Sequence, residues 1–253
     1  MRWLAMRLLL LNGNTDPAIT DLLAARAAEA IPRLGLPPAE IVPATAPFGA
    51  RYIATRAAVA IAGHAVLAAL AEHVGPANPR GFDAALIACF GEPGIEAARE
   101  ILPIPVVGMA EASIAAALRI APRIALLTGG ALWVPMLEEF ALLRGHGPDR
   151  ILVRGVAPTG DMIARDPDGA VALLAEAARA AAHDGAGAVV LGGAGLAGLA
   201  PRLAPHVPVP VLDSLDCALA AALAPATAPP RVAQAPQVAL GAALARLLAG
   251  PHA

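Results

Sequence analysis

One phrase of the sequence occurs twice, with a change at its most reactive position. Residues 82–113 read FDAALIACFGEPGIEAAREILPIPVVGMAEAS, and residues 187–218 read GAVVLGGAGLAGLAPRLAPHVPVPVLDSLDCA. Each copy runs from an apolar strand into a turn of small residues, a short helix, a strand rich in Pro and Val, and a turn with an acidic residue. Cys89 closes the first strand, whereas its counterpart in the second copy is Gly193. We therefore expect a duplicated half-site with a thiol on one side.

Short apolar runs alternate along the chain with Ala-rich segments of helical length. Several of these runs are continuously apolar, as expected for strands that are covered on both faces in a parallel sheet. The alternation predicts βαβ units, whose right-handed crossovers build a doubly wound α/β structure. The expected strands are 7–12, 84–89, 106–107, 123–128, 151–156, 188–192 and 209–212, and the expected helices are 17–30, 51–72, 94–100, 132–143, 167–183, 195–203 and 237–248.

The repeat extends beyond the doubled phrase, because the apolar run 7–11 with its polar turn parallels the run 123–127 with its own turn. We expect an α/β fold of two similar doubly wound lobes, with parallel sheets related by pseudo-twofold symmetry. Residues 1–110 with 213–253 would form the first lobe, and residues 111–212 the second. Ligands of open α/β sheets bind beyond the carboxyl ends of the strands. An active-site cleft is therefore expected between the lobes, and the Pro- and Ala-rich segment near the C-terminus is expected to be a surface connection.

Hydrophobic residues make up 58% of the chain, but Ala inflates this share. The longest uncharged stretch, 185–201, is interrupted by glycines and falls short of the roughly 20 apolar residues that a spanning helix needs. The first 15 residues are interpreted as a strand and its turn rather than a signal peptide, because Arg7 interrupts the apolar run. We expect a cytoplasmic protein that does not bind a membrane.

Charge and metal-ligand patterns exclude further classes of partner. All 18 basic residues are Arg, the net charge is -2, and the arginines form no basic stripe, so nucleic acid is not an expected partner. The two Cys lack CxxC spacing, and the six His are scattered. Neither a disulfide framework nor a metal site is expected. These patterns favour a small-molecule ligand.

Cys89 is the leading candidate for chemistry. It stands at a strand end and is followed by a Gly-containing turn and a helix. Backbone N–H groups at a helix N-terminus stabilise a thiolate, and they can also hold a carboxylate or an enolate oxygen. The alternative is a small buried hydrophobic residue, which is a common role of free Cys. Cys217 lies at an apolar position of a helix and is interpreted as a packing residue.

Polar turns at the strand ends provide candidate binding groups. The turn that contains Asn12, Asn14 and Thr15 offers amide and hydroxyl groups, although Thr15 or Asp16 could simply cap the next helix. No dinucleotide-binding pattern is present in this turn. Glu111 and Asp216 are expected to cap helices or to point towards the cleft. The candidate substrate-binding residues are Asn12, Asn14, Thr15, Phe90, Gly91, Thr128, Gly129, Gly193 and Ala194.

The sequence resembles the aspartate/glutamate/hydantoin racemase superfamily, most closely its hydantoin racemase branch, over nearly the whole chain. The residues that carry the resemblance are 12–15, 49–56, 88–94, 108–113, 127–135 and 191–195. The resemblance implies cofactor-independent chemistry in which two thiols from the two lobes flank a carbon next to a carboxylate or carbonyl. The first thiol corresponds to Cys89. The second corresponds to Gly193, which has no side chain to exchange a proton.

Three functions are compatible with a single thiol. The first is a racemase or isomerase acting on a small carboxylate, amino acid or hydantoin, with Cys89 as its acid/base. The second is a decarboxylase of disubstituted malonates. The chain is similar in this respect to the arylmalonate decarboxylases, but those keep the thiol of the second lobe and this chain keeps that of the first. The third is a non-catalytic binder of small carboxylates. A homo-oligomer is compatible with the resemblance.

Overall fold

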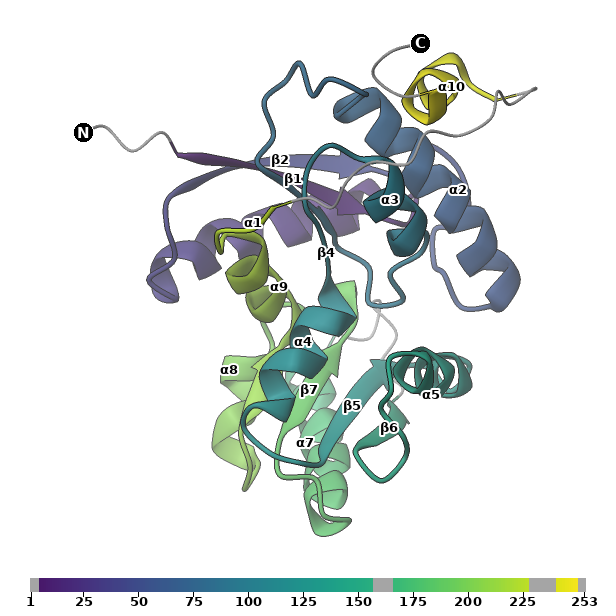
Figure 1. Ribbon diagram of the computed structural model, residues 1–253. Coiled ribbons are helices and arrows are strands. Elements are labelled where there is room, and N and C mark those ends of the chain that lie inside the picture. The colour runs from purple at the N-terminus through teal and green to yellow at the C-terminus, as the bar shows by residue number, and fades with distance from the viewer. Residues whose placement is uncertain (1–4, 157–165, 228–239, 250–253) are drawn as a thin grey trace.

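The computed structural model describes residues 5–156, 166–227 and 240–249 of the chain. These residues form two four-stranded parallel sheets with flanking helices, one sheet above the other in Figure 1. The first sheet has the order β2-β1-β3-β4 and the second has the order β6-β5-β7-β8. The strands are β1 (Met6–Asn12), β2 (Ala39–Thr45), β3 (Ala84–Ile87), β4 (Val106–Gly108), β5 (Ile124–Gly129), β6 (Ile151–Val156), β7 (Val189–Gly192) and β8 (Val211–Asp213).

The helices cover the sheets and connect their strands, as the alternating pattern predicts. Ala-rich helices bury small and branched side chains, several of them against a sheet. The helices are α1 (Pro17–Arg33), α2 (Arg56–His73), α3 (Ile95–Ile101), α4 (Met109–Leu118), α5 (Trp133–Leu143), α7 (Pro167–His183), α8 (Ala200–Leu203), α9 (Ser214–Ala222) and α10 (Ala242–Ala249), with 3-10 turns η1 (Ala194–Leu196) and η2 (Ala204–His206).

Strand register confirms that the two lobes are copies of one arrangement. Leu11 of β1 pairs with Ile87 of β3, and Leu127 of β5 pairs with Leu191 of β7. Cys89 lies two residues after Ile87, and Gly193 lies two residues after Leu191. The α/β fold of two similar lobes is therefore present, and the two positions are structurally equivalent.

The lobes meet at a shared hydrophobic core. Helix α4, which leads from the first sheet to the second, packs against α9, which follows the last strand of the second sheet. Both helices lie at the junction of the two sheets in Figure 1, and α9 also contacts α1 and β3. Helix α10 packs on α2. Because α4 and α9 contact both lobes, the division into 1–110 with 213–253 and 111–212 stays a prediction.

Several parts of the secondary structure differ from expectation. The last helix begins at Ala242 rather than at residue 237, and the strand expected at 84–89 ends at Ile87. Strand β2 was not expected, because Pro43 interrupts its apolar run and Pro is confined to edge strands such as this one. Helix α2 begins at Arg56 rather than at residue 51, with the Thr55 hydroxyl accepting a hydrogen bond from Ala58 N at 3.2 Å. The expected helix 195–203 is divided between η1 and α8. Of the expected surface connection, residues 225–236, the part from 228 onwards lies outside the described part of the chain.

None of the helices in the described ranges is both long and apolar enough to cross a membrane.

Candidate active site

Cys89 lies just beyond the carboxyl end of β3, where it is half-buried. The turn after β1 passes directly beside it. A Cβ atom at Gly13 would stand 3.2 Å from the Cys89 Cβ atom and 3.3 Å from the Pro93 ring. A glycine at position 13 is therefore what lets the first turn of the sheet approach the thiol.

The turn after β1 is held together by its own amides. Asn12 is fully buried, and its Nδ2 donates to Asn14 Oδ1 at 2.9 Å and to Thr20 Oγ1 at 3.1 Å. Its Oδ1 accepts a hydrogen bond from Asn14 N at 3.1 Å. Asp16 caps α1 by accepting from Ala18 N. The buried Asn12 side chain thus holds the conformation of the turn, while Asn14 and Thr15 are half-buried.

The proton affinity of the Cys89 thiol differs from the expectation. Burial raises its pKa to about 11, and the charge of Glu92 adds to the rise, although the N–H groups of Gly91 and Glu92 lower it. The N–H groups at the turn act in the expected direction, but the loss of water around the sulfur outweighs them. The expectation of a stabilised thiolate is therefore wrong for the ligand-free protein, and the thiol holds its proton at neutral pH.

The equivalent position in the second lobe is open. Gly193 has φ 141 and ψ 140, and no described atom lies within 4 Å of the place where its Cβ would stand. L-residues with side chains rarely adopt this conformation. The turn continues through Ala194 into η1, and both residues are half-buried. On the neighbouring strand, Thr128 is buried and Gly129 is half-buried.

Residues of the Cys89 turn pack against the second lobe. The Phe90 ring is buried over Gly192, since a Cβ at that glycine would overlap the ring. A Cβ at Gly91 would likewise overlap the Trp133 ring, which begins α5. Trp133 Nε1 donates in turn to Ile53 O at 2.9 Å. Phe90 and Gly91 therefore fix the thiol-bearing turn against the opposite lobe.

Tyr52 is a candidate site residue that the sequence analysis did not single out. Its hydroxyl donates to Gly129 O at 2.7 Å, so it bridges the loop before α2 and the strand end of the second lobe. The same loop meets the first turn, where Thr15 N donates to Ala50 O at 3.1 Å. Aromatic residues make up 3% of the chain, and Tyr52 is its single tyrosine. The rarity of aromatic residues was the feature of the sequence that could have pointed to Tyr52 as a site residue.

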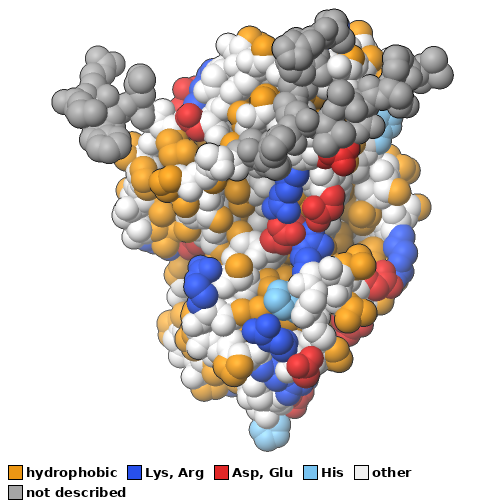
Figure 2. Space-filling view, viewed as in Figure 1, with side chains coloured by type: hydrophobic (Ala, Val, Ile, Leu, Met, Phe, Trp, Pro, Cys, Tyr) orange, Lys and Arg blue, Asp and Glu red, His pale blue; other side chains and the backbone are white. Residues whose placement is uncertain are grey.

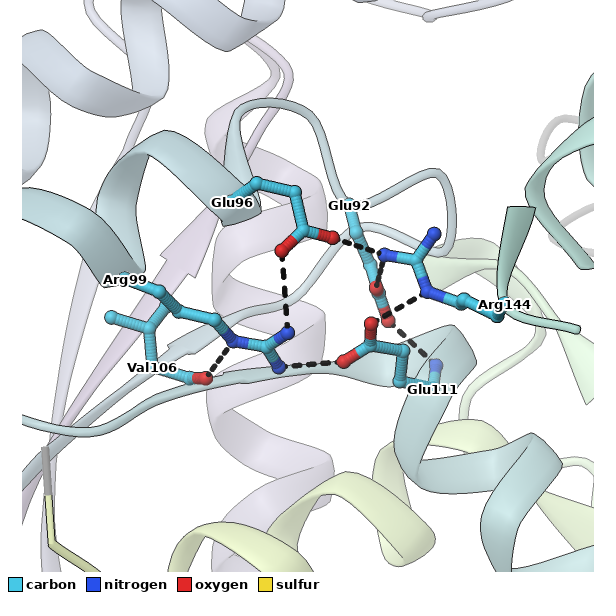
Figure 3. A network of polar contacts seen from close by, with 6 residues as sticks. All are labelled: Glu92, Glu96, Arg99, Val106, Glu111 and Arg144. Carbon is cyan, nitrogen blue, oxygen red and sulfur yellow. Dashed lines mark hydrogen bonds and ion pairs between the residues drawn. The ribbon is translucent and has the colours of Figure 1, made fainter. Parts of the chain in front are cut away.

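The two repeat-related acidic residues do not cap their helices. The N-cap positions are Gly108 for α4 and Asp213 for α9. Glu111 instead forms ion pairs with arginines of α3 and of the segment after α5 (Figure 3), and Asp216 pairs with Arg33 at 2.8 Å. Both carboxylates lie in the first turn of a helix, so the favourable interaction with the helix N-terminus remains.

Cys217 lies on α9, which packs against α4, and it is half-buried. Burial raises its pKa to about 11. It therefore belongs to the contact between the two junction helices. Across the part of the chain that the structure describes, no three His, Cys, Asp or Glu side chains are grouped so that they could hold a metal ion.

Relatives of known identity match the chain in sequence. Hydantoin racemase of Paenarthrobacter aurescens is 32% identical over 216 residues, which is 84% of this chain and 88% of that protein. The hydantoin racemases of Rhizobium meliloti and Pseudomonas sp. (strain NS671) are 38% and 37% identical over 143 and 147 residues. The aligned region spans 58% of the length of each of these two proteins.

Solved structures share the fold of this chain. Allantoin racemase from Pseudomonas fluorescens superposes with a TM-score of 0.77 at 30% identity, covering 86% of this chain and 89% of that one. A mutant of arylmalonate decarboxylase superposes with a TM-score of 0.62 at 18% identity, which shows a common fold. The profile of the family described as Asp/Glu/Hydantoin racemase matches residues 8–222. By this match and by the relatives aligned along most of its length, the chain belongs to the Asp/Glu/hydantoin racemase family.

Proposed function

We propose that the chain is a cofactor-independent racemase of hydantoin-class substrates, such as 5-substituted hydantoins or allantoin, with Cys89 as its thiol acid/base. The observation that carries the proposal is the place of Cys89, at the strand end of one lobe and next to residues that pack on the other. The names of the sequence relatives and of the allantoin racemase structure support this substrate class.

The proposed chemistry begins with a substrate bound between the strand ends of the two lobes. A hydrogen on carbon next to a carbonyl is weakly acidic, so a positioned base and donors to the enolate oxygen must share the work. Asn14 and Thr15 of the first lobe, and Thr128, Gly129 and Ala194 of the second, are proposed to bind the carbonyl and N–H groups. Asn12 is proposed to act by shaping the turn that presents Asn14.

Protons are exchanged differently on the two faces in this proposal. On the open face at Gly193, water removes the α-proton, and the electron pair moves onto the carbonyl oxygen to give an enolate. The Cys89 thiol then donates its proton to the opposite face of the same carbon. The thiolate regains a proton from solvent, and the reverse reaction starts from the thiolate. The raised pKa of Cys89 suits it to donation in the forward direction.

The same raised pKa favours one alternative, a single-thiol decarboxylase. Loss of carbon dioxide from a disubstituted malonate leaves its bonding electrons on the α-carbon as an enediolate. A neutral thiol then protonates that carbon on one face, and no base is required. In this alternative, Gly193 provides the space for the departing carboxylate.

Both functions are tested by replacing each cysteine in turn. The Cys89→Ala variant and the matched control Cys217→Ala are incubated with single enantiomers of 5-substituted hydantoins, allantoin and amino acids in D2O. Proton NMR measures α-deuteration, and polarimetry measures inversion. Parallel incubations with a malonate panel measure carbon dioxide release.

The racemase proposal expects the wild type and Cys217→Ala to invert a hydantoin-class substrate with incorporation of deuterium. It expects Cys89→Ala to lose activity by roughly 10²–10⁴-fold, the usual contribution of a positioned acid/base. Equal exchange by Cys89→Ala would overturn the role of the thiol. Malonate decarboxylation without exchange would establish the alternative, and binding without either reaction would indicate a non-catalytic binder.

A further inference from the structure

Each lobe places one buried carboxylate at the N-terminus of the helix that leaves its last strand, but the two come from different positions. Gly108 and Asp213 are equivalent by register, because they pair with Ile87 and Leu191. Asp213 caps its own helix by accepting a hydrogen bond from Leu215 N at 3.0 Å, and it also accepts one from Gly198 N, in the loop after η1, at 2.6 Å. The first lobe has a glycine at this place and needs its carboxylate from elsewhere.

Glu92 provides that carboxylate from the Cys89 turn. A Cβ built at Gly108 would overlap the Glu92 carboxyl group, so the glycine leaves the space that this group fills. Glu92 Oε1 accepts a hydrogen bond from Glu111 N in the first turn of α4 at 2.8 Å. Helix α4 joins the lobes, so Glu92 ties the thiol-bearing turn to their junction. In Figure 3 its side chain runs from the turn towards the start of α4.

The backbone of this turn is adapted to keep a side chain at position 92. Glu92 has φ 45, and Asn78 is the other non-glycine residue with a positive φ in the described part of the chain. Asn adopts this conformation with relative ease, whereas for Glu it carries a strain that glycine would avoid. The hydrogen bond to α4 offsets this strain, which argues that the carboxylate itself is needed.

The charges around Glu92 do not fully neutralise it. Three carboxylates, those of Glu92, Glu96 and Glu111, share the guanidinium groups of Arg99 and Arg144 (Figure 3). Arg144 lies closer to the other two, at 2.8 Å from Glu96 and 2.5 Å from Glu111, than to Glu92 Oε2 at 3.6 Å. Figure 2 shows the corresponding band of acidic and basic side chains between α3 and α4.

Glu92 is also the least solvated member of the cluster. It is 3% exposed, and its Oε2 has no hydrogen-bond partner among the described residues. Burial raises its pKa to about 7. By contrast, although burial acts against it, the two guanidinium groups hold the pKa of Glu111 below its usual value. The cluster therefore has one more carboxylate than it has guanidinium groups, and Glu92 has the longest ion pair with Arg144 of the three carboxylates.

We infer that Glu92 is a positioning residue of the Cys89 half-site. Its N–H donates to Cys89 O at 2.9 Å and its carboxylate accepts from Glu111 N at 2.8 Å, so it anchors the thiol-bearing turn to α4 and places a negative charge in that turn, which adds to burial in disfavouring the thiolate. Its relevance to turnover rests on the proposed function. The effect on the thiol does not, because thiol reactivity can be measured without a substrate. Protonation of Glu92 would remove the charge and release the thiol proton more easily, while the hydrogen bond to Glu111 N persists.

The test is the pH dependence of Cys89 alkylation by iodoacetamide. It is carried out in a Cys217→Ala background, so that one thiol is left in the chain. Glu92→Gln removes the charge and keeps an oxygen that can accept from Glu111 N. The matched control is Asp213→Asn, which removes the equivalent carboxylate of the other lobe. Thermal unfolding of each variant shows whether the fold is retained.

Glu92→Gln is expected to raise the alkylation rate at pH 8 roughly three- to tenfold and to move the pH profile to lower pH, because a like charge has been removed. Asp213→Asn is expected to leave the Cys89 profile unchanged. An unchanged or slower profile in a folded Glu92→Gln protein would overturn the inference. So would an equal shift in Asp213→Asn. Neither outcome depends on whether Cys89 racemises a hydantoin, which separates this test from that of the proposed function.

Discussion

The two half-sites share a scaffold and differ in chemistry. Cys89 and Gly193 follow the equivalent paired residues Ile87 and Leu191 by two positions, and each lobe buries a carboxylate at the start of the next helix. In the first lobe, Cys89 is held in a turn that Phe90 and Glu92 fix on two sides. In the second lobe, Gly193 lies in an open turn with a backbone suited to glycine.

The two halves of the duplication share a set of physical roles rather than a set of positions. The first N–H groups of a helix have no acceptor within the helix, so a helix N-terminus that is buried at the lobe junction needs acceptors from elsewhere in the chain. Asp213 meets that need within its own strand, and Glu92 meets it from a preceding turn. In the first lobe, the cap that Glu92 provides comes from the same turn as the thiol. In the second lobe, the cap comes from Asp213, which lies outside the equivalent turn.

The strongest way to break the asymmetry is to add the missing thiol. Gly193→Cys has space for a side chain but must bear a glycine-type φ of 141. If the half-sites are mirror partners, the second thiol replaces water as the acid/base on that face. We expect inversion to accelerate by roughly 10²-fold, the lower end for a positioned acid/base. Polarimetry of a hydantoin-class enantiomer measures it.

The matched control for this variant is Gly193→Ala, which imposes the same backbone strain without a thiol. Both variants are expected to lose roughly 1–3 kcal/mol of stability from the strained conformation. A folded Gly193→Cys protein that inverts no faster than Gly193→Ala would mean that the second half-site differs from the first by more than one side chain.

The two buried carboxylates predict a stability that falls as the pH rises. Burial raises the pKa of Glu92 from 4.5 to about 7 and that of Asp213 from 3.8 to about 6. Because the pKa of each carboxyl is higher in the folded than in the unfolded protein, its contribution to stability is fully present below the unfolded-state pKa. That contribution is lost as the pH rises through the folded-state pKa. Each loss is on the order of 3 kcal/mol, since one pKa unit corresponds to about 1.4 kcal/mol.

Urea unfolding at pH 4, 5, 6, 7 and 8 checks this prediction. Glu92→Gln should lose the decline between about pH 4.5 and 7, and Asp213→Asn the decline between about pH 4 and 6. If both variants follow the wild-type curve, the carboxylates are better solvated than their burial implies.

The smallest effect is expected where the lobes pack across the site. Gly192→Ala places a methyl group against the buried Phe90 ring. Overpacking of this kind should cost roughly 1–2 kcal/mol. The control is Gly195→Ala, where no described atom lies within 4 Å of the new Cβ. Urea unfolding of both measures the difference, and equal stabilities would show that the ring moves aside freely.

Several elements could be predicted because their signals are local. The apolar runs that became β1, β5 and β6 are bounded by polar or Gly-containing turns, and their strands lie within a residue of the expected bounds. Strand β2 escaped prediction because its stability depends on pairing with β1, which overrides the signal of Pro43. Helix α2 was placed too early because the residues before Arg56 form the loop that reaches the second lobe.

The duplicated α/β framework, the family and the thiol on one side can all be read from neighbouring residues, since strand periodicity and a repeated phrase are local properties. The behaviour of that thiol depends on the folded chain. The raised pKa of Cys89, the Phe90 contact with Gly192 and the cap that Glu92 provides to α4 all join segments that are distant in sequence or depend on burial. Burial and cross-lobe contact are sums over the folded chain, so no local pattern specifies them.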